Sequence, residues 1–390
     1  MRLAYVCADA GVPVFGRKGC SIHVQEVLRA FLRRGIEVDL FAARFGGKPP
    51  AALERVRVHP LPEPTAGDAV SRERQALEAN RFLEGALRRS GPFDVLYERY
   101  SLWSFAGIEY ARRTGLPGIL EVNAPLIEEH SKYRGLSDRD AAEKVAGRCF
   151  AAAGVIVAVS EGVAATLERH PAARGRIRVV PNGVDPGRFR PDIAPAAPAP
   201  PGVFTVGFVG SLKPWHGIST LVEAFARFRE SEGDARLLVV GDGPERRTLD
   251  AEVSERGLAA FTRLTGPVDP EEVPRFLVSM DAAVAPYPSD ASFYFSPLKV
   301  YEYMAAGLPV IASAVGQLAD LLEEGRCGIL CTPGDPAEFA EALVRLRRDP
   351  DLRRRLGRDA RARVLRECTW DMVAERLLEA ATPAAVAEGR

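Results

Sequence analysis

The sequence has no excess of charge of either sign. Its 52 lysines and arginines equal its 52 aspartates and glutamates, so the formal net charge at pH 7 is zero. Bulk binding to nucleic acid therefore gains no support, although a neutral chain can still carry local patches. No stretch approaches the roughly eighteen apolar residues of a membrane span, and the first apolar run is too short for a signal peptide. These absences favour a cytoplasmic protein.

Cysteine is also scarce, and the six cysteines fit no zinc-binding spacing. Cys327 and Cys331 share an expected strand, where four-residue spacing separates them by ~13 Å, too far for a disulfide. We expect buried, reduced thiols. The chain lacks an Asp-x-Asp metal motif after an apolar strand, and it lacks a Gly-x-Ser-x-Gly elbow. Both absences weaken metal-dependent and hydrolase functions, and we expect neither metal nor cofactor.

Short apolar strands alternate with amphipathic helices along the whole chain, which predicts an α/β fold with parallel sheets. A helix is expected over 21–34, because Val24, Val27, Leu28 and Phe31 recur at helical spacing. The expected strands are 3–7, 37–42, 94–98, 118–122, 155–160, 177–180, 204–209, 236–240, 262–265, 282–285, 310–313 and 328–331.

Five prolines in residues 191–202 predict an extended connector, since proline cannot donate to a sheet. We therefore expect an N-terminal doubly wound domain over 1–190, a linker over 191–203, and a second such domain over 204–368. A last helix follows over 369–390. Two sheets of this kind would place ligands in a cleft at the carboxyl ends of their strands.

The loop after the expected strand 204–209 reads Gly210-Ser211-Leu-Lys213-Pro-Trp-His216-Gly217 and precedes a helix. Free N–H groups and the positive dipole end of such a helix favour an anion. Lys213 and His216 are its cationic candidates, and Lys213 could hold a diphosphate oxygen. The loop by itself fits an ordinary connection with a solvated lysine equally well.

A second candidate segment begins Ser296-Pro297-Leu298-Lys299. Serine followed by proline predicts a helix N-cap and first turn, and Gly307 is expected to end that helix. Lys299 would oppose the helix dipole unless an anion binds there. Glu302 could accept hydrogen bonds from a ribose diol. The alternative is a plain cap with a surface glutamate.

Two N-terminal segments face the same expected cleft. The loop 9–21 contains Gly16 and Gly19, which would let backbone approach a ligand, and Ser21 is expected to cap the next helix. Glu121 and Asn123 end a strand and share one of its faces. Each feature also fits a simple polar fringe.

The pattern Gly241-Asp242-Gly243-Pro244 superficially matches a dinucleotide-binding loop, but the third glycine is missing. A tight turn explains it, and a dehydrogenase becomes a distant alternative.

Together these motifs resemble the retaining glycosyltransferases of family 4 (glycosyl transferases group 1), which have the GT-B fold. The resemblance covers 19–26, 157–162, 179–185, 208–217, 240–245 and 301–310, in order and spacing. It implies two Rossmann-like domains facing a cleft, with the helix at Trp370 crossing back to the N-terminal domain. It also implies a nucleotide-diphosphate sugar donor in the C-terminal domain and an acceptor in the N-terminal one.

The resemblance assigns roles to particular positions. Glu302 matches the glutamate that holds the donor ribose, 297–299 match the stretch that meets the diphosphate, and Gly16 and Gly19 match the loop that closes over it. Three positions depart from the usual pattern. Tyr294 replaces a first glutamate, Ser211 and His216 replace a basic pair, and Asn123 replaces a histidine. Asp290 or Glu121 are candidates for the lost carboxylate.

We therefore expect a metal-independent, retaining hexosyl- or glycosyltransferase (EC 2.4). The expected catalytic residues are Lys213, Glu302, Asn123 and Glu121. The expected donor-binding residues are Gly16, Gly19, Gly210, Ser211, His216, Asp290, Ser296, Pro297, Leu298 and Lys299. The acceptor could be a saccharide, a lipid-linked saccharide or a small natural product. Arginines over 347–363 leave peripheral contact with the inner membrane surface open. The alternatives are a nucleotide-sugar 2-epimerase-like isomerase and a non-catalytic nucleotide-sugar binder.

Overall fold

The structure, a computed structural model, describes residues 1–65, 67–133, 135–289 and 293–381. The chain divides into two compact units. The N-terminal unit comprises Met1–Asn182, Tyr294–Ser296 and Trp370–Arg390, and the C-terminal unit comprises Gly183–Phe293 and Pro297–Thr369. The proline-rich segment 191–202 thus belongs to the C-terminal unit.

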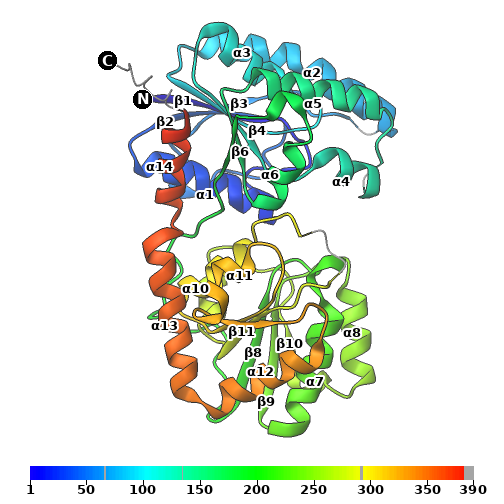
Figure 1. The fold of residues 1–390 in the computed structure, drawn as a ribbon, viewed down its shortest axis with the longest axis vertical. Coiled ribbons are helices and arrows are strands. Elements are labelled where there is room, and N and C mark those ends of the chain that lie inside the picture. Colours follow the sequence, from blue (N-terminus) through cyan, green and yellow to red (C-terminus); the bar gives the residue numbers. More distant parts are fainter. Residues whose placement is uncertain (66, 134, 290–292, 382–390) are drawn as a thin grey trace. The chain divides into compact units, whose positions relative to one another are not determined.

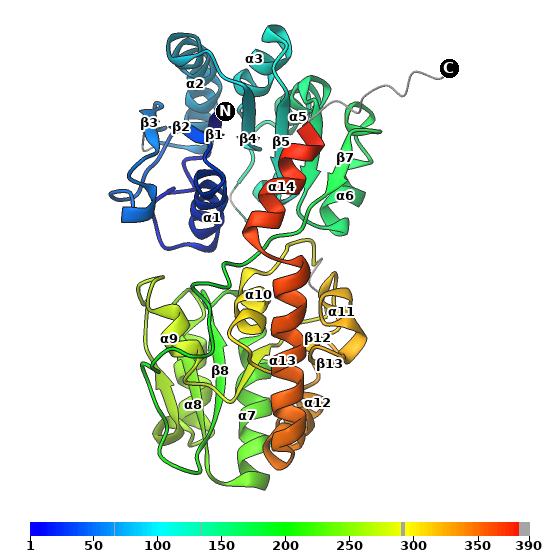
Figure 2. The same ribbon diagram turned by 90° about the vertical axis from the view of Figure 1, so that its left-hand side faces the viewer.

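A seven-stranded parallel sheet forms the centre of the N-terminal unit, in the order β3-β2-β1-β4-β5-β6-β7 (Figure 1). Its strands are β1 (Arg2–Cys7), β2 (Glu37–Ala42), β3 (Arg57–Pro60), β4 (Val95–Arg99), β5 (Gly118–Val122), β6 (Val155–Ala158) and β7 (Ile177–Val179). Its helices are α1 (Gly19–Arg33), α2 (Ala69–Ser90), α3 (Ala106–Thr114), α4 (Leu126–Tyr133), α5 (Arg139–Ala152), α6 (Glu161–Leu167) and α14 (Trp370–Ala381). Helices α1 and α14 pack together on one face, and α2, α3 and α5 cover the other (Figure 2).

A six-stranded parallel sheet forms the C-terminal unit, in the order β10-β9-β8-β11-β12-β13. Its strands are β8 (Phe204–Val209), β9 (Ala235–Val240), β10 (Thr262–Leu264), β11 (Ala282–Ala285), β12 (Val310–Ser313) and β13 (Ile329–Cys331). Its helices are α7 (Ile218–Glu232), α8 (Arg246–Glu255), α9 (Val273–Leu277), α10 (Leu298–Ala305), α11 (Leu318–Leu321), α12 (Pro336–Arg348) and α13 (Pro350–Glu367). Helix α7 packs between α8 and α12, and α10 packs against α13.

The parallel sheets predicted from the sequence are confirmed. Strands buried on both faces need continuous apolar runs, and all six residues of β8 are buried. Helix α1 turns its predicted apolar face inward, where Val24, Val27, Leu28 and Phe31 are at most 1% exposed. The described cysteines are all thiols, and four of the six are buried. Within the described ranges, no helix is both long and apolar enough to cross a bilayer.

Strand β3 was not predicted, because it is a short edge strand without an apolar run. Ionic contacts hold it beside β2. The fully buried Asp39 lies 2.9 Å from the Arg57 guanidinium and 2.8 Å from the His59 ring, and Arg2 approaches it at 2.8 Å. Burial alone would raise the pKa of Asp39, but hydrogen bonds from these three side chains outweigh burial and hold that pKa below its usual range.

Each sheet reverses its strand order once, between β1 and β4 in one unit and between β8 and β11 in the other. At such a point the connections leave the sheet toward opposite faces, so the carboxyl ends of the two strands border a crevice. The loop after β8 and the start of α10 lie at the β8–β11 pair, whereas Arg99 and Glu121 lie at the ends of β4 and β5, next to the β1–β4 pair.

The close approach of α13 to the end of α10 in the C-terminal unit can be tested directly. A Cβ atom on Gly357 of α13 would lie 2.1 Å from the carbonyl oxygen of Gly307, which follows α10. Because backbone cannot move away as a flexible side chain can, we expect Gly357→Ala to cost about 1–3 kcal/mol of stability. The measurement is the midpoint of thermal unfolding.

Gly147→Ala in α5 is the matched control. No described atom lies within 4 Å of a Cβ placed there, so the same change should be neutral or gain about 0.5–1 kcal/mol. Equal midpoints for the two variants would show that the α10–α13 approach is not tight.

Candidate functional site

The loop between β8 and α7 is shaped by glycines at both ends. Gly210 follows β8 with φ +140°, and Gly217 precedes α7 with φ +63°. A Cβ on Gly217 would lie 1.6 Å from the carbonyl oxygen of Pro286, so any larger residue would displace the end of the β11 segment. Between these glycines, Ser211 is exposed and Lys213 half-buried. The loop is thereby held against the residues that follow β11.

His216 is a neutral ring in this loop. Burial, with smaller contributions from the charges of Lys299 and Lys213, lowers the pKa of His216 to about 2. Its Nδ1 lies 2.5 Å from the carbonyl oxygen of Ser211. Since a carbonyl only accepts, Nδ1 carries the proton, and Nε2 presents a lone pair. Of the two cationic candidates in the loop, Lys213 rather than His216 therefore supplies the positive charge.

Helix α10 begins later than predicted. Its N-cap is Pro297 and its first residue is Leu298, so Ser296 does not cap it. The Ser296 side chain is engaged elsewhere, because the Asn182 backbone N–H donates to its Oγ at 3.1 Å. The Asn182 side chain also donates to the Ser296 carbonyl at 2.8 Å. These bonds hold residues 294–296 on the N-terminal unit. Gly307 does follow the helix, with φ +73°.

Lys299 is the most unusual group of the C-terminal unit. Its side chain is buried, and Nζ has no hydrogen-bond partner among the described residues. Nζ lies 4.2 Å from the ring centroid of Phe208, near the end of β8, and 5.6 Å from that of Tyr287, which follows β11. A Cβ on Gly210 would lie 3.2 Å from Nζ. The start of α10 therefore lies against the end of β8 and the loop that follows it.

The surroundings set the charge of Lys299. Burial lowers the pKa of Lys299 to about 7, against an opposing effect of the Glu302 carboxylate. The two rings offset part of the cost of burying its ammonium group. Glu302 is half-buried one turn further along α10. Tyr303 ties this helix to β8, since its hydroxyl accepts a hydrogen bond from the Val209 backbone N–H at 2.8 Å.

The turn Gly241-Asp242-Gly243 packs against the same loop. A Cβ on Gly241 would lie 2.1 Å from the Gly210 carbonyl oxygen, and one on Gly243 would lie 2.4 Å from that of Leu212. Backbone packing therefore explains both glycines. Helix α8 begins at Arg246, after this turn. Asp290, another predicted donor contact, lies outside the described residues.

In the N-terminal unit, Glu121 is the centre of a buried polar network. His23 Nε2 lies 3.2 Å from its Oε1, and Arg99 Nη1 lies 3.5 Å from its Oε2. Burial alone would raise the pKa of Glu121, but His23, Arg99 and Tyr97 outweigh it and lower that pKa to about 2. Glu121 is therefore a fixed anion.

This network orients Asn123. The Asn123 side-chain nitrogen donates to Glu121 Oε2 at 2.8 Å. Because a carboxylate only accepts, the amide must turn its nitrogen toward Glu121, so Oδ1 points away from it. Asn123 is half-buried. The sequence placed Glu121 and Asn123 on one face of β5, and the structure shows that one positions the other.

Sequence reasoning missed His23 and Arg99. Arg99 Nη1 lies 3.2 Å from His23 Nδ1, and since a guanidinium only donates, the His23 proton is on Nε2, toward Glu121. Trp370 of α14 packs edge-on against the His23 ring at 5.3 Å. Arg99 ends β4, beside β5, so its position at a strand end was an available signal. His23 lies on the buried face of α1 and carried no such signal.

The glycine loop of this unit is anchored by a helix side chain. The Gln25 amide donates to the carbonyl oxygens of Val14 and Gly16, at 2.8 and 2.9 Å. Gly19 is the first residue of α1, and Lys18 is its N-cap. Ser21 consequently lies inside the helix, buried, and the prediction that it caps α1 is wrong. Helix α1 begins at Gly19, two residues before the expected start at Ser21, so its N-cap is Lys18.

Two parallel, doubly wound sheets with these loops define the GT-B class of glycosyltransferases. HepE from Anabaena, solved with UDP and glucose, superposes with a TM-score of 0.74 over 98% of this chain and 100% of that one, at 18% identity.

Relatives place the chain within that class. Residues 17–188 match Glycosyltransferase Family 4, and residues 203–349 match Glycosyl transferases group 1. The D-inositol 3-phosphate glycosyltransferase of Acidothermus cellulolyticus is 30% identical, over 95% of this chain and 85% of that protein. The 2-deoxystreptamine glucosyltransferase of Streptomyces kanamyceticus is 31% identical, over 68% and 70%. The chain therefore belongs to the group 1, family 4 glycosyltransferases.

The charge of Lys299 gives a prediction about pH. The pKa of this lysine is about 7 in the folded protein and 10.5 ordinarily. Between these values the unfolded chain binds a proton that the folded chain does not, so the cost of burying Lys299 is largest below pH 7 and shrinks as pH rises. We therefore expect the stability of Lys299→Met, relative to the parent protein, to be more favourable at pH 6 than at pH 9.

Thermal unfolding of the nucleotide-free proteins at both values measures this difference. Lys213→Met, which removes a half-buried lysine of the neighbouring loop, is the control variant. A Lys299→Met effect that does not change with pH would contradict the placement of the lysine.

Proposed function

We propose that the protein transfers a sugar from a nucleotide-diphosphate sugar to an acceptor hydroxyl, with retention of configuration and without a metal ion. The observation that carries the proposal is the meeting of the Gly210–Gly217 loop with the start of α10 at the carboxyl ends of β8 and β11, in a chain of this family. Both segments offer backbone N–H groups and positive charge to an anion.

Charge stabilisation is the proposed source of rate acceleration. As the glycosidic bond breaks, the leaving diphosphate gains negative charge, and Lys213 together with the first turn of α10 stabilises it. A leaving phosphate oxygen takes the proton of the attacking hydroxyl. Among the described residues, no group of three or more His, Cys, Asp or Glu side chains could hold a metal ion. The proposed chemistry needs none, because cationic side chains and N–H groups supply the charge.

Lys299 contributes differently from Lys213 in this proposal. With a pKa of about 7, Lys299 is partly neutral before a ligand arrives. A nearby diphosphate favours its protonated form, so donor binding would be accompanied by proton uptake at neutral pH. Glu302 stands one turn away, at the position that the family resemblance assigns to the donor ribose.

In the N-terminal unit, the proposed role of Asn123 is to accept a hydrogen bond from a substrate hydroxyl through Oδ1. Glu121 acts through Asn123 rather than on the substrate, since donors approach both of its oxygens. The relatives support UDP-glucose as the first donor to test, since one structural neighbour contains UDP and glucose. A cytoplasmic location, where nucleotide sugars are made, and peripheral contact with the inner membrane surface are extensions of this proposal.

The donor site can be tested by binding. We expect Lys213→Ala and Glu302→Ala each to weaken nucleoside diphosphate binding by about 1–3 kcal/mol, the range for hydrogen bonds to charged groups. The nucleotide is first chosen by thermal shift from UDP, GDP, ADP and dTDP, and affinities are then measured by calorimetry. Glu255→Ala, an exposed position near the end of α8, is the control. Unchanged affinity in both site variants would rule out this donor site.

The reaction itself is tested by product analysis. With UDP-glucose and a panel of acceptors, we expect a glycoside with the donor's anomeric configuration, seen by proton NMR and formed equally with and without EDTA. Conversion of the donor sugar without transfer would instead indicate an isomerase. Nucleotide-sugar binding with neither transfer nor hydrolysis would indicate a binding protein.

A further inference from the structure

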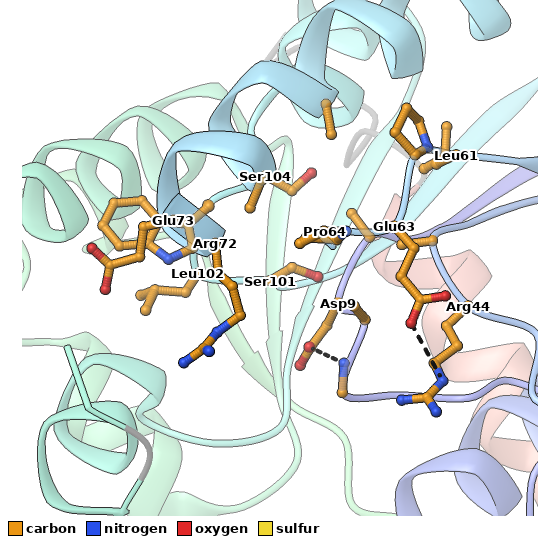
Figure 3. A pocket seen from close by; sticks show the side chains of 18 of the residues that line it. Asp9, Arg44, Leu61, Glu63, Pro64, Arg72, Glu73, Ser101, Leu102 and Ser104 are labelled. Atoms are coloured by element: carbon orange, nitrogen blue, oxygen red, sulfur yellow. Dashed lines mark hydrogen bonds and ion pairs between the residues drawn. The ribbon is translucent and has the colours of Figure 1, made fainter. Parts of the chain in front are cut away.

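The N-terminal unit contains a cavity of about 420 Å³, and none of the predicted site residues that the structure describes lines it. It opens where β1, β2, β3 and β4 end, and α2 forms its opposite wall (Figure 3). Its size falls within the range of small-molecule sites, and it borders the strand-order reversal between β1 and β4.

The inner wall of the cavity is apolar. It is formed by Leu61 after β3, Leu83 on α2, and Leu102 and Trp103 after β4, all at most 8% exposed. A ligand that reached this wall would bury a nonpolar face of its own against it. A ring whose C–H groups form such a face meets that requirement.

The buried polar side chains that line the cavity donate their hydrogens to acceptors within the protein. The Ser101 hydroxyl donates to the Arg99 carbonyl oxygen at 3.2 Å, and the Ser104 hydroxyl donates to Glu98 Oε1 at 2.6 Å. The Asn80 amide nitrogen donates to the carbonyl oxygens of Leu77 and Trp103. Toward the cavity the two serines therefore offer lone pairs only.

Two carboxylates add further acceptors. Asp9 Oδ1 accepts from the Gly11 backbone N–H at 2.7 Å, and Glu73 Oε1 accepts from that of Ser137 at 2.9 Å. No described residue donates a hydrogen bond to the second oxygen of either carboxylate, so that oxygen can accept from a ligand. Figure 3 shows Asp9 near the centre of the cavity and Glu73 at its edge.

The two described arginines of the lining are partly engaged. Arg44 pairs with Glu63 at 3.5 Å, and Arg72 donates to the Gly67 carbonyl oxygen. Among the described residues of the lining, three are acidic, two are arginines and one is a histidine, His130. Acidic side chains thus outnumber the arginines in the described lining, and each of these arginines has a protein partner.

We propose that this cavity binds the acceptor, and that the acceptor is a neutral or amino-bearing cyclic polyol rather than a phosphate ester. Hydroxyl and ammonium groups donate to the oxygens of Asp9, Glu73 and the two serines, while the ring packs on Leu102 and Trp103. A phosphate, which only accepts at neutral pH, would be repelled by the Asp9 and Glu73 carboxylates and would have to pair with Arg44 or Arg72, each of which already has a partner. The identification of the ligand as the acceptor rests on the proposed transferase function, whereas the binding of a polyol in this cavity does not.

The neighbours Arg72 and Glu73 on α2 provide a matched test. Binding of 2-deoxystreptamine, myo-inositol and myo-inositol 3-phosphate to the full chain is measured by titration calorimetry at low salt, with and without UDP. We expect the diamine to bind most tightly and the phosphate ester most weakly. Glu73→Gln should weaken diamine binding roughly tenfold or more, as expected for a hydrogen bond to a charged group. Arg72→Gln should change diamine binding by about twofold at most.

Two results would overturn the proposal. One is tightest binding of the phosphate ester, lost in Arg72→Gln and kept in Glu73→Gln. The other is no binding of any of the three polyols. Thermal unfolding and UDP affinity of both variants check that each is folded. Failure of UDP binding in the parent protein would count against the proposed donor site alone, because the polyols are also titrated without nucleotide.

Discussion

The burial of the Lys299 ammonium group is the constraint around which the C-terminal unit is arranged. A buried cation without a hydrogen-bond partner is costly, and here two aromatic rings, from the ends of β8 and β11, and a nearby carboxylate are its compensation. Gly210 is required beside it, because a side chain there would crowd Nζ. The loop after β8, the segment after β11 and the first turn of α10 are thereby kept together.

In the N-terminal unit the central buried charge is an anion. Glu121 stays ionised because His23, Arg99 and Asn123 surround it, and the contacts come from α1, β4 and the end of β5. One unit thus holds a cation that can lose its proton near neutral pH, and the other holds an anion that cannot gain one there. Glu121 can therefore act as a fixed group that orients its neighbours in the N-terminal unit. Lys299 in the C-terminal unit can change its charge when a ligand binds.

Sequence reasoning worked best where the signal was local. Short segments rich in apolar residues identified the strands of the described ranges other than β3, which is held by ion pairs to Asp39 instead of an apolar face. It was least reliable at helix starts. Ser296 and Ser21 are both good caps in isolation, yet Asn182 engages the first, and the second lies within α1. Whether a serine caps a helix depends on which hydrogen-bond partner its side chain has in the folded protein, and that partner can be distant in the chain.

The sequence by itself determined the alternation of strands and helices, the positions of the glycine-bounded loops and the residues at the ends of β5 and β8. These follow from hydropathy and backbone conformation, which act between neighbours. Only the tertiary structure decided that His216 is neutral, that Lys299 is buried, that Glu121 orients Asn123, and that a cavity lies between α2 and the ends of four strands. Charge state and hydrogen-bond direction depend on desolvation and on partners from distant elements, and those exist only once the sheets have formed.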